Sequence, residues 1–414
     1  MTNQLIVYLN TTKAGILERD GRLLTFSYSP DYLDLPGASP ISRLLPLAPT
    51  VYGDDATRAF FSNLLPEGAV LTQVARQVGI SKENVFGLLG AIGGDCAGAI
   101  SVSASDSLPE PTGSYRPVSE QELSDELDRL PSHPFMAGEE GVRLSLAGAQ
   151  NKLPLFFDGG NYYIPEGASP SSHILKTAIA QLDNTVINET FCMTLAARVG
   201  LPVPAAQVVT IGGKQVFMVE RYDRKRSEPG ETVRLHQEDF CQALGIPPEL
   251  KYEKEGGPGF SNCFELVEEW SSEPLLDASN LLNWAIYNFI IGNADAHGKN
   301  VSFLYNEGLV RVAPFYDLIS TAVYRRLDNK FAMMMGGQRD ARYLPQDTLG
   351  KFATEIGIDI RIVKSAFVKM MDSIEAISPQ LLDEYRDRFG APVILDDIAR
   401  VISYRIAKGR ELVQ

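Results

Sequence analysis

A change of pattern near residue 223 constrains the fold of this chain more than any other feature. From Val142 to Glu220 the sequence reads mostly as short strands separated by turns, whereas beyond Asp223 it reads mainly as helix, with one hairpin at Val301–Val312. A mostly β block followed by a mostly α block predicts an α/β chain of the α+β kind, with two lobes and a cleft between them.

The residues upstream of this block predict a further, N-terminal unit. A chain of 414 residues should hold two to four domains, and residues 104–117 are polar and proline-rich, which is typical of a linker. We expect domains at residues 1–110, 111–225 and 226–414. The elements expected in the first are strands at Leu5–Leu9 and Leu23–Tyr28, helices at Ala56–Leu65 and Val70–Val78, and a glycine-rich passage at Gly87–Gly98.

The β block and its flanks can be assigned element by element. Ser119 and Glu122 form a capping-box pattern that predicts the start of a helix, and Gly200 with Pro202 predicts the end of another. The remaining expected elements are strands at Val142–Leu146, Leu153–Phe157, Tyr162–Ile164, His173–Thr177, Gln207–Ile211 and Gln215–Glu220, turns at Asp158–Asn161 and Gly212–Gly213, and a helix at Thr185–Val199.

The composition argues against several classes of protein. With 38 basic and 52 acidic side chains the net charge is −14, so phosphate backbones repel the chain and direct nucleic-acid binding is disfavoured. The longest apolar run, Leu281–Ile291, is too short to cross a membrane and contains two asparagines. Four scattered cysteines argue against a zinc site or a disulfide framework, and the N-terminus lacks the pattern of a secretory signal. We therefore expect a cytoplasmic globular protein.

The segment Gly292–Asn300, with the sequence GNADAHGKN, carries the clearest chemical signal. It follows the apolar run Leu281–Ile291, which predicts a buried helix and therefore a rigid support. The spacing of Asp295 and Asn300 is that of the protein-kinase catalytic loop, in which the Asp accepts the proton of the substrate hydroxyl and the Asn helps to hold Mg²⁺. By itself, the same spacing is more often an ordinary turn.

A second carboxylate follows one hairpin later. Strands expected at Val301–Tyr305 and Leu309–Ala313 lead to Asp317, where kinases place another metal-binding carboxylate. Mg²⁺ prefers carboxylate, carbonyl and water oxygens, which suits a pair formed by Asn300 and Asp317. The alternative is that Asp317 caps a helix at Leu318–Val323.

The β block supplies candidate contacts for a nucleotide. Small residues at Ala147–Ala149, within the segment Ser145–Lys152, let backbone N–H groups approach phosphates closely. Lys176 lies on an apolar strand, and Glu189 is the only charged residue in the interior of an otherwise apolar helix. We predict an ion pair between them, as in kinases, with surface exposure of Glu189 as the alternative.

The order of these elements is stronger evidence than any one of them. The strand Phe217–Glu220 leads into Tyr222, and its exposed backbone groups could hydrogen-bond an adenine ring. A phosphate loop, a lysine strand, a glutamate helix, an interlobe strand, a catalytic loop and a metal-binding Asp then follow one another as they do in kinases.

In its sequence motifs, the chain resembles the HipA family of serine/threonine kinase toxins over nearly its whole length. The motifs that carry the resemblance are FFSNLLPEG at Phe60–Gly68, SLAGAQNK at Ser145–Lys152, PEG and HILK within Pro165–Lys176, VERYDR at Val219–Arg224, QEDFCQALG at Gln237–Gly245, KYE and GGPG within Lys251–Gly259, DAHGKN at Asp295–Asn300, and PFYD at Pro314–Asp317. Together these motifs are highly specific.

The resemblance implies a two-lobed protein-kinase-like fold, with a β-rich N-lobe, an α-helical C-lobe and an extra small N-terminal subdomain. It implies ATP as the phosphate donor, Asp295 as the proton acceptor, and Asn300 and Asp317 as Mg²⁺ ligands. The ATP contacts that it implies are Ala147, Gly148, Ala149, Gln150, Asn151, Lys152, Lys176, Glu220, Arg221, Tyr222, His297, Gly298, Lys299, Asn300, Tyr316 and Asp317.

The resemblance also implies regulation and partners. In the family, the serine before the phosphate loop, here Ser145, is autophosphorylated, which ejects the loop and silences the enzyme. It implies a small DNA-binding antitoxin of the HipB type, DNA contact only through that antitoxin, no membrane, and a protein substrate such as an aminoacyl-tRNA synthetase. Two other functions stay open: a non-catalytic partner in an antitoxin–operator repressor complex, and a small-molecule phosphotransferase.

Overall fold

The structure is a computed structural model that describes residues 3–105, 114–139, 141–227 and 231–414. The chain divides into two compact units. Unit 1 takes in the described residues of Met1–Thr177, Val209–Glu249 and Phe303–Leu309, and unit 2 those of Ala178–Val208, Leu250–Ser302 and Val310–Gln414. The division into domains at residues 1–110, 111–225 and 226–414 stays a prediction.

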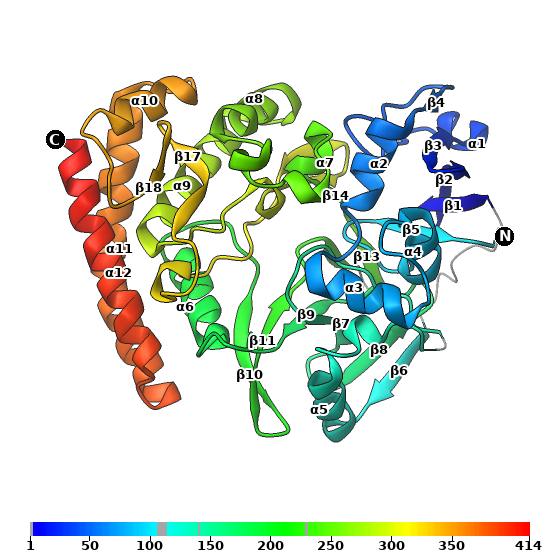
Figure 1. The fold of residues 1–414 in the computed structure, drawn as a ribbon, viewed down its shortest axis with the longest axis horizontal. Coiled ribbons are helices and arrows are strands. Elements are labelled where there is room, and N and C mark those ends of the chain that lie inside the picture. The colour runs from blue at the N-terminus through cyan, green and yellow to red at the C-terminus, as the bar shows by residue number, and fades with distance from the viewer. Residues whose placement is uncertain (1–2, 106–113, 140, 228–230) are drawn as a thin grey trace. The chain divides into compact units, whose positions relative to one another are not determined.

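Unit 1 begins with a five-stranded antiparallel sheet in the order β4-β3-β2-β1-β5, which Figure 1 shows in blue to cyan. Alternate side chains of these strands face a shared core. There the ring of Phe26 on β3 packs 5.8 Å from that of Phe61 on α2. The elements are β1 (Gln4–Leu9), β2 (Thr12–Asp20), β3 (Leu23–Tyr28), α1 (Pro30–Leu33), β4 (Val51–Tyr52), α2 (Asp54–Ser62), α3 (Gly68–Gln77), α4 (Val85–Ile92) and β5 (Ile100–Ser103).

The second sheet of unit 1 has six strands in the order β10-β11-β9-β7-β8-β6. Its strands are β6 (Ser114–Val118), β7 (Lys152–Phe157), β8 (Tyr162–Glu166), β9 (His173–Lys176), β10 (Ala206–Ile211) and β11 (Lys214–Glu220). The other elements of this part of the chain are α5 (Glu120–Arg129), η1 (Pro134–Met136), β12 (Arg224–Ser227), β13 (Glu231–Arg234), β14 (His236–Asp239), α7 (Phe240–Leu244), η2 (Pro248–Leu250) and β15 (Ser302–Asn306).

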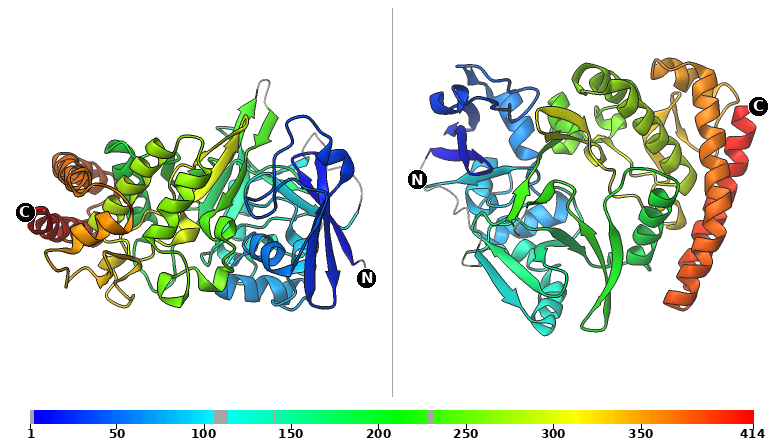
Figure 2. Two further views of the ribbon diagram at one scale, coloured as in Figure 1. Left: turned by 90° about the horizontal axis from the view of Figure 1, so that it is seen from above. Right: turned by 180° about the vertical axis from the view of Figure 1, so that it is seen from behind.

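Unit 2 is mainly helical and is built around α9, whose side chains are buried over its last three turns. Helix α9 packs against α8, α11 and α12, and α11 and α12 run side by side in Figures 1 and 2. The elements are α6 (Thr185–Arg198), η3 (Glu253–Glu255), α8 (Phe260–Trp270), α9 (Pro274–Ile291), η4 (Gly298–Asn300), β16 (Leu309–Val312), η5 (Thr321–Val323), β17 (Lys330–Met335), β18 (Gln338–Asp340), α10 (Thr348–Glu355), α11 (Ile360–Phe389) and α12 (Val393–Val413).

Most predicted elements are confirmed, including the helix after Ser119, whose capping box with Glu122 is formed. The strand expected at Val142–Leu146 is wrong. There the extended chain makes only an isolated bridge from Leu144 to Asp95, because its backbone pairs with a loop instead of a sheet. Of the linker expected at residues 104–117, residues 106–113 lie outside the described residues and β6 occupies Ser114–Val118.

Two further expectations need correction. The helix at Leu318–Val323 is reduced to the 3₁₀ turn Thr321–Val323, in a segment rich in β-branched residues that disfavour a helix. Beyond Asp223 the chain is less purely helical than predicted, because the hairpins β12–β13 and β17–β18 also form.

Two statements about composition can be compared with the structure. All four cysteines are buried, and none of them forms a disulfide bond. No helix within the described ranges combines the length and the apolar character that a membrane crossing demands.

Candidate active site

Helix α9 fixes the start of the catalytic-loop candidate in unit 2. The helix ends at Gly292, whose φ is 71°. A Cβ at this position would lie 2.7 Å from Val401 Cγ1 and 2.8 Å from Ala322 Cβ. Only glycine combines a left-handed backbone with so close an approach of neighbouring side chains, so the turn out of α9 is rigidly defined.

Asp295 is exposed, while the other residues of Ile291–Asn300 are buried. Asn293 braces its backbone, since the Asn293 Oδ1 accepts a hydrogen bond from the Asp295 N–H at 3.0 Å. Tyr252 braces its side chain, since the tyrosine hydroxyl donates to Asp295 Oδ1 at 2.7 Å. An exposed carboxylate held on both sides can accept a proton from a bound hydroxyl group.

Sequence reasoning did not assign a role to Tyr252. Its ring meets the His297 ring edge-on, with centroids 5.4 Å apart, and the ammonium groups of Lys251 and Lys254 lie 5.4 and 5.9 Å from its centroid. The only sequence signal was its place in the KYE motif at Lys251–Glu253. Nothing in the spacing connects that motif with Asp295.

Asn300 and Asp317 are both tied to the residues around Asp295. The Asn300 Nδ2 donates to the Asp295 carbonyl at 3.1 Å, so its Oδ1 is the atom that can ligate a cation. Asp317 has a φ of 55°, a left-handed conformation that is uncommon and costly outside glycine. Its carbonyl accepts from the Asn293 Nδ2 at 3.3 Å. The alternative role as a helix cap is wrong, because Ser320 and not Asp317 occupies the N-cap position of the following turn.

The chemistry of this pair fits Mg²⁺, which is often bound through one or two carboxylates together with substrate phosphates. Among the described residues, no group of three or more His, Cys, Asp or Glu side chains is placed to hold a metal ion. A kinase-type site relies instead on one carboxylate and one amide oxygen from the protein.

The other candidates of unit 2 belong to the same hydrogen-bonded group. His297, Gly298, Lys299 and Asn300 are buried, and the last three form η4. The Tyr316 hydroxyl donates to the Lys299 carbonyl at 2.6 Å and shares a hydrogen bond of 2.8 Å with the Ser302 hydroxyl. Unit 2 therefore brings together all the residues that the sequence predicts for its catalytic and metal-binding loops.

In unit 1, the phosphate-loop candidate Ser145–Lys152 is folded around Gly148. This glycine has a φ of 110°, and a Cβ there would lie 2.8 Å from Lys152 Nζ. The Lys152 ammonium donates to the Ala147 carbonyl, and the Gly148 carbonyl accepts from the Glu67 N–H at 3.1 Å. Farther along, the Gln150 amide donates to the Thr177 carbonyl at 3.2 Å.

Lys152 and Lys176 are directly opposite each other on β7 and β9. Both are nearly buried, with exposed fractions of 9% and 7%, and the Lys176 ammonium also lies 5.4 Å from the centroid of the Phe217 ring. Two ammonium groups therefore lie on one face of the sheet, next to a glycine-containing loop. This combination fits an anionic ligand such as a polyphosphate.

Ser145 is fully buried at the start of the loop. Its hydroxyl donates to the Leu64 carbonyl at 2.8 Å, and its N–H donates to the Asp95 carbonyl at 3.1 Å. A phosphate on this hydroxyl could not fit in the same place, since it adds roughly −1.5 to −2 charges and needs polar partners.

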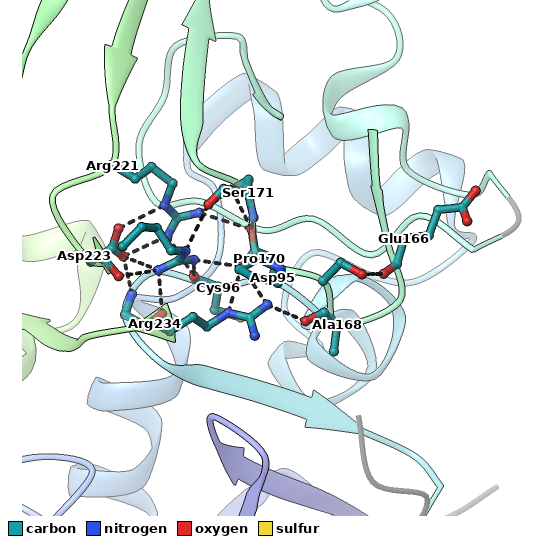
Figure 3. A network of polar contacts seen from close by, with 12 residues as sticks. Asp95, Cys96, Glu166, Ala168, Pro170, Ser171, Arg221, Asp223 and Arg234 are labelled. Atoms are coloured by element: carbon teal, nitrogen blue, oxygen red, sulfur yellow. Dashed lines mark hydrogen bonds and ion pairs between the residues drawn. The ribbon is translucent and has the colours of Figure 1, made fainter. Parts of the chain in front are cut away.

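The segment Glu220–Tyr222 starts at the last residue of β11 and continues into the turn that follows. The guanidinium group of Arg221 is buried and bound to Asp95 and Asp223, as Figure 3 shows. The backbone N–H of Arg221 donates to the Ser172 carbonyl at 2.9 Å. The Tyr222 hydroxyl donates to the Gln237 side chain. The ATP contacts expected in this segment stay a prediction.

Glu189 lies on α6 in unit 2 and is 4% exposed. The alternative of surface exposure is therefore wrong. Its ion pair with Lys176 stays a prediction, as do the contacts of Ala149 and Asn151 with ATP.

Comparisons with known proteins cover most of the chain. Residues 5–103 match the HipA N-terminal domain, and residues 144–378 match the HipA-like C-terminal domain. The chain is 41% identical over 369 residues to the Sinorhizobium fredii protein Y4mE, covering 88% of each. It is 32% identical over 397 residues to the serine/threonine-protein kinase toxin HipA of Shewanella oneidensis, covering 92% of this chain and 90% of that protein.

A solved structure agrees with these matches. In the complex of HipA, HipB and operator DNA from Shewanella oneidensis MR-1, one chain superimposes with a TM-score of 0.83 at 28% identity, over 98% of this chain and 96% of that one. The match confirms the predicted mixed α/β, kinase-like fold. With the catalytic-loop geometry and the two family domains, it shows that the chain belongs to the HipA family of serine/threonine kinase toxins.

Proposed function

We propose that this chain is an ATP-dependent serine/threonine protein kinase that acts as the toxin of a toxin–antitoxin pair. The observation that carries the proposal is the state of Asp295. It is exposed in a buried loop of kinase spacing, with its backbone held by Asn293 and its carboxylate held by Tyr252. This arrangement is expected of a group that must meet a substrate hydroxyl in a fixed orientation.

The residues of each unit have separate proposed tasks. In unit 1, Lys152, Lys176 and the loop around Gly148 would hold the phosphates of ATP. In unit 2, the Asn300 Oδ1 and the Asp317 carboxylate would ligate Mg²⁺, which when bound neutralises charge on the phosphates. The two lysines opposite each other on β7 and β9 support the first assignment, because they place two cationic groups on one face of the sheet. The carboxylate and amide oxygens of Asp317 and Asn300 support the second, because Mg²⁺ prefers such ligands.

Asp295 would accept the proton of a serine or threonine hydroxyl as that oxygen bonds to the γ-phosphorus of ATP. The bond from this phosphorus to the bridging oxygen of ADP breaks at the same time, and ADP leaves with the bonding electrons. The protein's contribution is mainly placement and charge stabilisation, which is usual for phosphoryl transfer.

Ser145 is proposed as the site of self-inactivation. Its hydroxyl is bonded to the Leu64 carbonyl inside unit 1, so the start of the loop must leave this position before Ser145 can be phosphorylated. Afterwards the phosphate prevents return, and the contact of Gly148 with Lys152 that shapes the loop is lost.

The proposed partners follow from the family and from the charge of the chain. The Shewanella complex contains HipB and operator DNA, and we propose a small DNA-binding antitoxin of the HipB type for this chain. With a net charge of −14, the chain would reach DNA only indirectly, through that partner. The proposed target is a cellular protein, for example an aminoacyl-tRNA synthetase.

The test is phosphoproteomics after induced expression in the absence of antitoxin, comparing the intact chain with Asp295→Gln. The intact chain should arrest growth and create new phosphoserine or phosphothreonine sites, including Ser145. The variant should do neither while melting at a similar temperature. Equal phosphorylation in both cultures would contradict the role of Asp295. Harmless expression without new phosphosites would favour the non-catalytic repressor partner, and turnover of a small molecule alone would favour the phosphotransferase.

A further inference from the structure

We propose that Asp95 is a positioning residue for ATP, because it ties the phosphate loop to the segment Glu220–Tyr222 within unit 1. The inference rests on the proposed function, since both segments are proposed to contact ATP. Asp95 lies among the first hundred residues, and none of these residues is among the proposed catalytic or ATP-binding residues.

The close approach that Asp95 needs is made possible by Gly94. A Cβ at Gly94 would lie 2.3 Å from the Gly167 carbonyl oxygen and 2.7 Å from the Arg143 Cβ. The loop after α4 therefore passes directly against the chain on either side of it, and Asp95 is fully buried there. This packing gives a physical role to the end of the glycine-rich passage Gly87–Gly98.

The backbone of Asp95 holds the extended segment that leads into the phosphate loop. Its N–H donates to the Arg143 carbonyl at 2.8 Å, and its carbonyl accepts from the Ser145 N–H at 3.1 Å. The Arg143 guanidinium in turn donates to the Gly90 carbonyl at 3.0 Å and to the Val102 carbonyl at 2.6 Å. The position of Ser145, the first residue of the loop, is therefore set by the loop that carries Asp95.

The side chain of Asp95 reaches in the other direction, as Figure 3 shows. Its Oδ2 accepts from Arg221 Nη1 at 3.2 Å and from the Ser171 hydroxyl at 2.7 Å. Its Oδ1 accepts from Arg224 Nη2 at 2.7 Å and from Arg234 Nη2 at 3.0 Å. Three guanidinium groups thus converge on one carboxylate.

Arg221 is the middle residue of the segment Glu220–Tyr222. Its ion pair with Asp95 therefore ties this segment to the loop that carries Asp95. The Arg221 Nε and Nη2 also bind Asp223 at 3.0 and 2.8 Å. Asp223 in turn accepts from the Gly98 N–H at 2.7 Å. The loop that carries Asp95 therefore holds this segment at two points, one through Arg221 and one through Asp223.

The charges explain why Asp95 is the vulnerable member of the cluster. Burial raises the pKa of Asp95, but Arg224, Arg221 and Arg234 overcome that effect and hold the pKa well below its usual value. Loss of its charge would leave Arg221 and Arg224 with Asp223 as their shared carboxylate partner, and would remove the carboxylate that Arg234 binds. Mutual repulsion would then displace Arg221 and Arg224, and with them the backbone between.

The experiment measures the dissociation constant of a non-hydrolysable ATP analogue with Mg²⁺, using the full chain and Asp95→Asn, well below both melting temperatures. We expect binding at least about tenfold weaker in the variant. The kcat for phosphorylation of an added serine-containing peptide at saturating ATP should change much less, since the contacts of Asp95 described above lie within unit 1.

Asp277→Asn is the matched control. Asp277 is also fully buried and bound to an arginine, with Arg311 Nη2 at 3.0 Å, but it lies at the start of α9 in unit 2. It should lower the melting temperature without weakening analogue binding. If Asp95→Asn does not fold, Asp223→Asn decides, because Asp223 also binds Arg221 and accepts from the Gly98 N–H, the second point at which this loop holds the segment; it should weaken binding in the same direction.

Two outcomes separate the proposals. Normal analogue binding by a folded Asp95→Asn or Asp223→Asn variant, or equal weakening by Asp277→Asn, would overturn the positioning role and leave the kinase assignment intact. A wild-type chain that fails to bind the analogue would contradict the proposed function itself.

Discussion

The hydrogen bond from Tyr252 to Asp295 is the contact on which the proposed chemistry depends most closely at the residue scale. It fixes one oxygen of the carboxylate and leaves the other for a substrate hydroxyl. Tyr252 is itself held between His297 and the lysines on either side of it. The orientation of Asp295 is thus supported by several residues.

Tyr252→Phe removes the donor and keeps the ring. We expect the rate of Ser145 labelling at saturating ATP to fall about tenfold or more, since a hydrogen bond to a charged group contributes about 1.5–3 kcal/mol. Tyr305→Phe is the control, because it removes a tyrosine hydroxyl from another carboxylate, Glu238 in unit 1. An equal rate in Tyr252→Phe and wild type would show that Tyr252 does not orient the base.

Glu238 provides a second residue-scale prediction, on stability and pH. Burial raises the pKa of Glu238 from 4.5 to about 7, although Tyr305, Ser42 and the Arg43 N–H donate to it. The native chain therefore keeps a proton that the unfolded chain loses. The stability that Glu238 contributes is complete below pH 4.5 and is lost as the pH rises to about 7.

Glu238→Gln resembles the protonated side chain at every pH. The melting temperature of the variant minus that of wild type should be more positive at pH 8 than at pH 5, by at least about 2 °C. In a unit of this size, about 1 kcal/mol of stability corresponds to 2–4 °C. Burial lowers the pKa of the neighbouring His236 to about 4, but that effect is common to both proteins and cancels in the difference. A difference that does not vary with pH would contradict the raised pKa.

Spacing along the chain explains which site residues the sequence could reveal. Asp295, Asn300 and Asp317 lie within one short stretch, and their order matches a known catalytic arrangement. Tyr252 and Asp95 act on residues far from them in sequence, through contacts that only the folded chain creates. No local pattern marks such residues.

At the scale of elements, the loop between Ser145 and β7 is the part most sensitive to change. Its shape depends on the left-handed Gly148, on the Lys152 ammonium beside it and on the hydrogen bond to the Glu67 N–H. That last contact gives a structural role to the FFSNLLPEG segment at Phe60–Gly68, which the sequence alone could not connect with the loop.

Gly148→Ala should weaken binding of the ATP analogue by about tenfold or more, because the added methyl would lie 2.8 Å from Lys152 Nζ and displace it. Gly159→Ala is the control. Its φ of 103° imposes a similar backbone strain, but a Cβ there meets nothing within 4 Å. Comparable weakening by both substitutions would mean that general strain, rather than the position of Lys152, determines binding.

Predictions of helices, strands and turns were correct where contacts between neighbouring residues determine the structure. They were wrong where the structure depends on pairing with residues distant in the sequence. The capping box at Ser119 and the turn at Asp158–Asn161 are set by neighbouring residues, and both form. The strand expected at Val142–Leu146 is extended as predicted, yet its hydrogen bonds go to the loop around Asp95. A residue pattern shows that a segment is extended but not which partner it finds.

At the scale of the whole molecule, each unit contains part of the proposed machinery. Unit 1 contains the two opposed lysines and the loop with Ser145, whereas unit 2 contains the base and the proposed Mg²⁺ ligands. The overall class was predictable because a β block and a helical block follow each other along the sequence. The target protein could not be predicted from the sequence, because its recognition depends on surfaces that no sequence motif identifies.

Asp295 is proposed to accept the proton of the Ser145 hydroxyl when phosphate is transferred from ATP to Ser145. The most direct measurement incubates the purified chain with γ-labelled ATP and Mg²⁺ and locates the label by mass spectrometry. We predict label on Ser145 in the wild-type chain, none at this position in Ser145→Ala, and none anywhere in a folded Asp295→Gln variant. Undiminished labelling in Asp295→Gln, or a wild-type chain that acquires no label, would contradict the account.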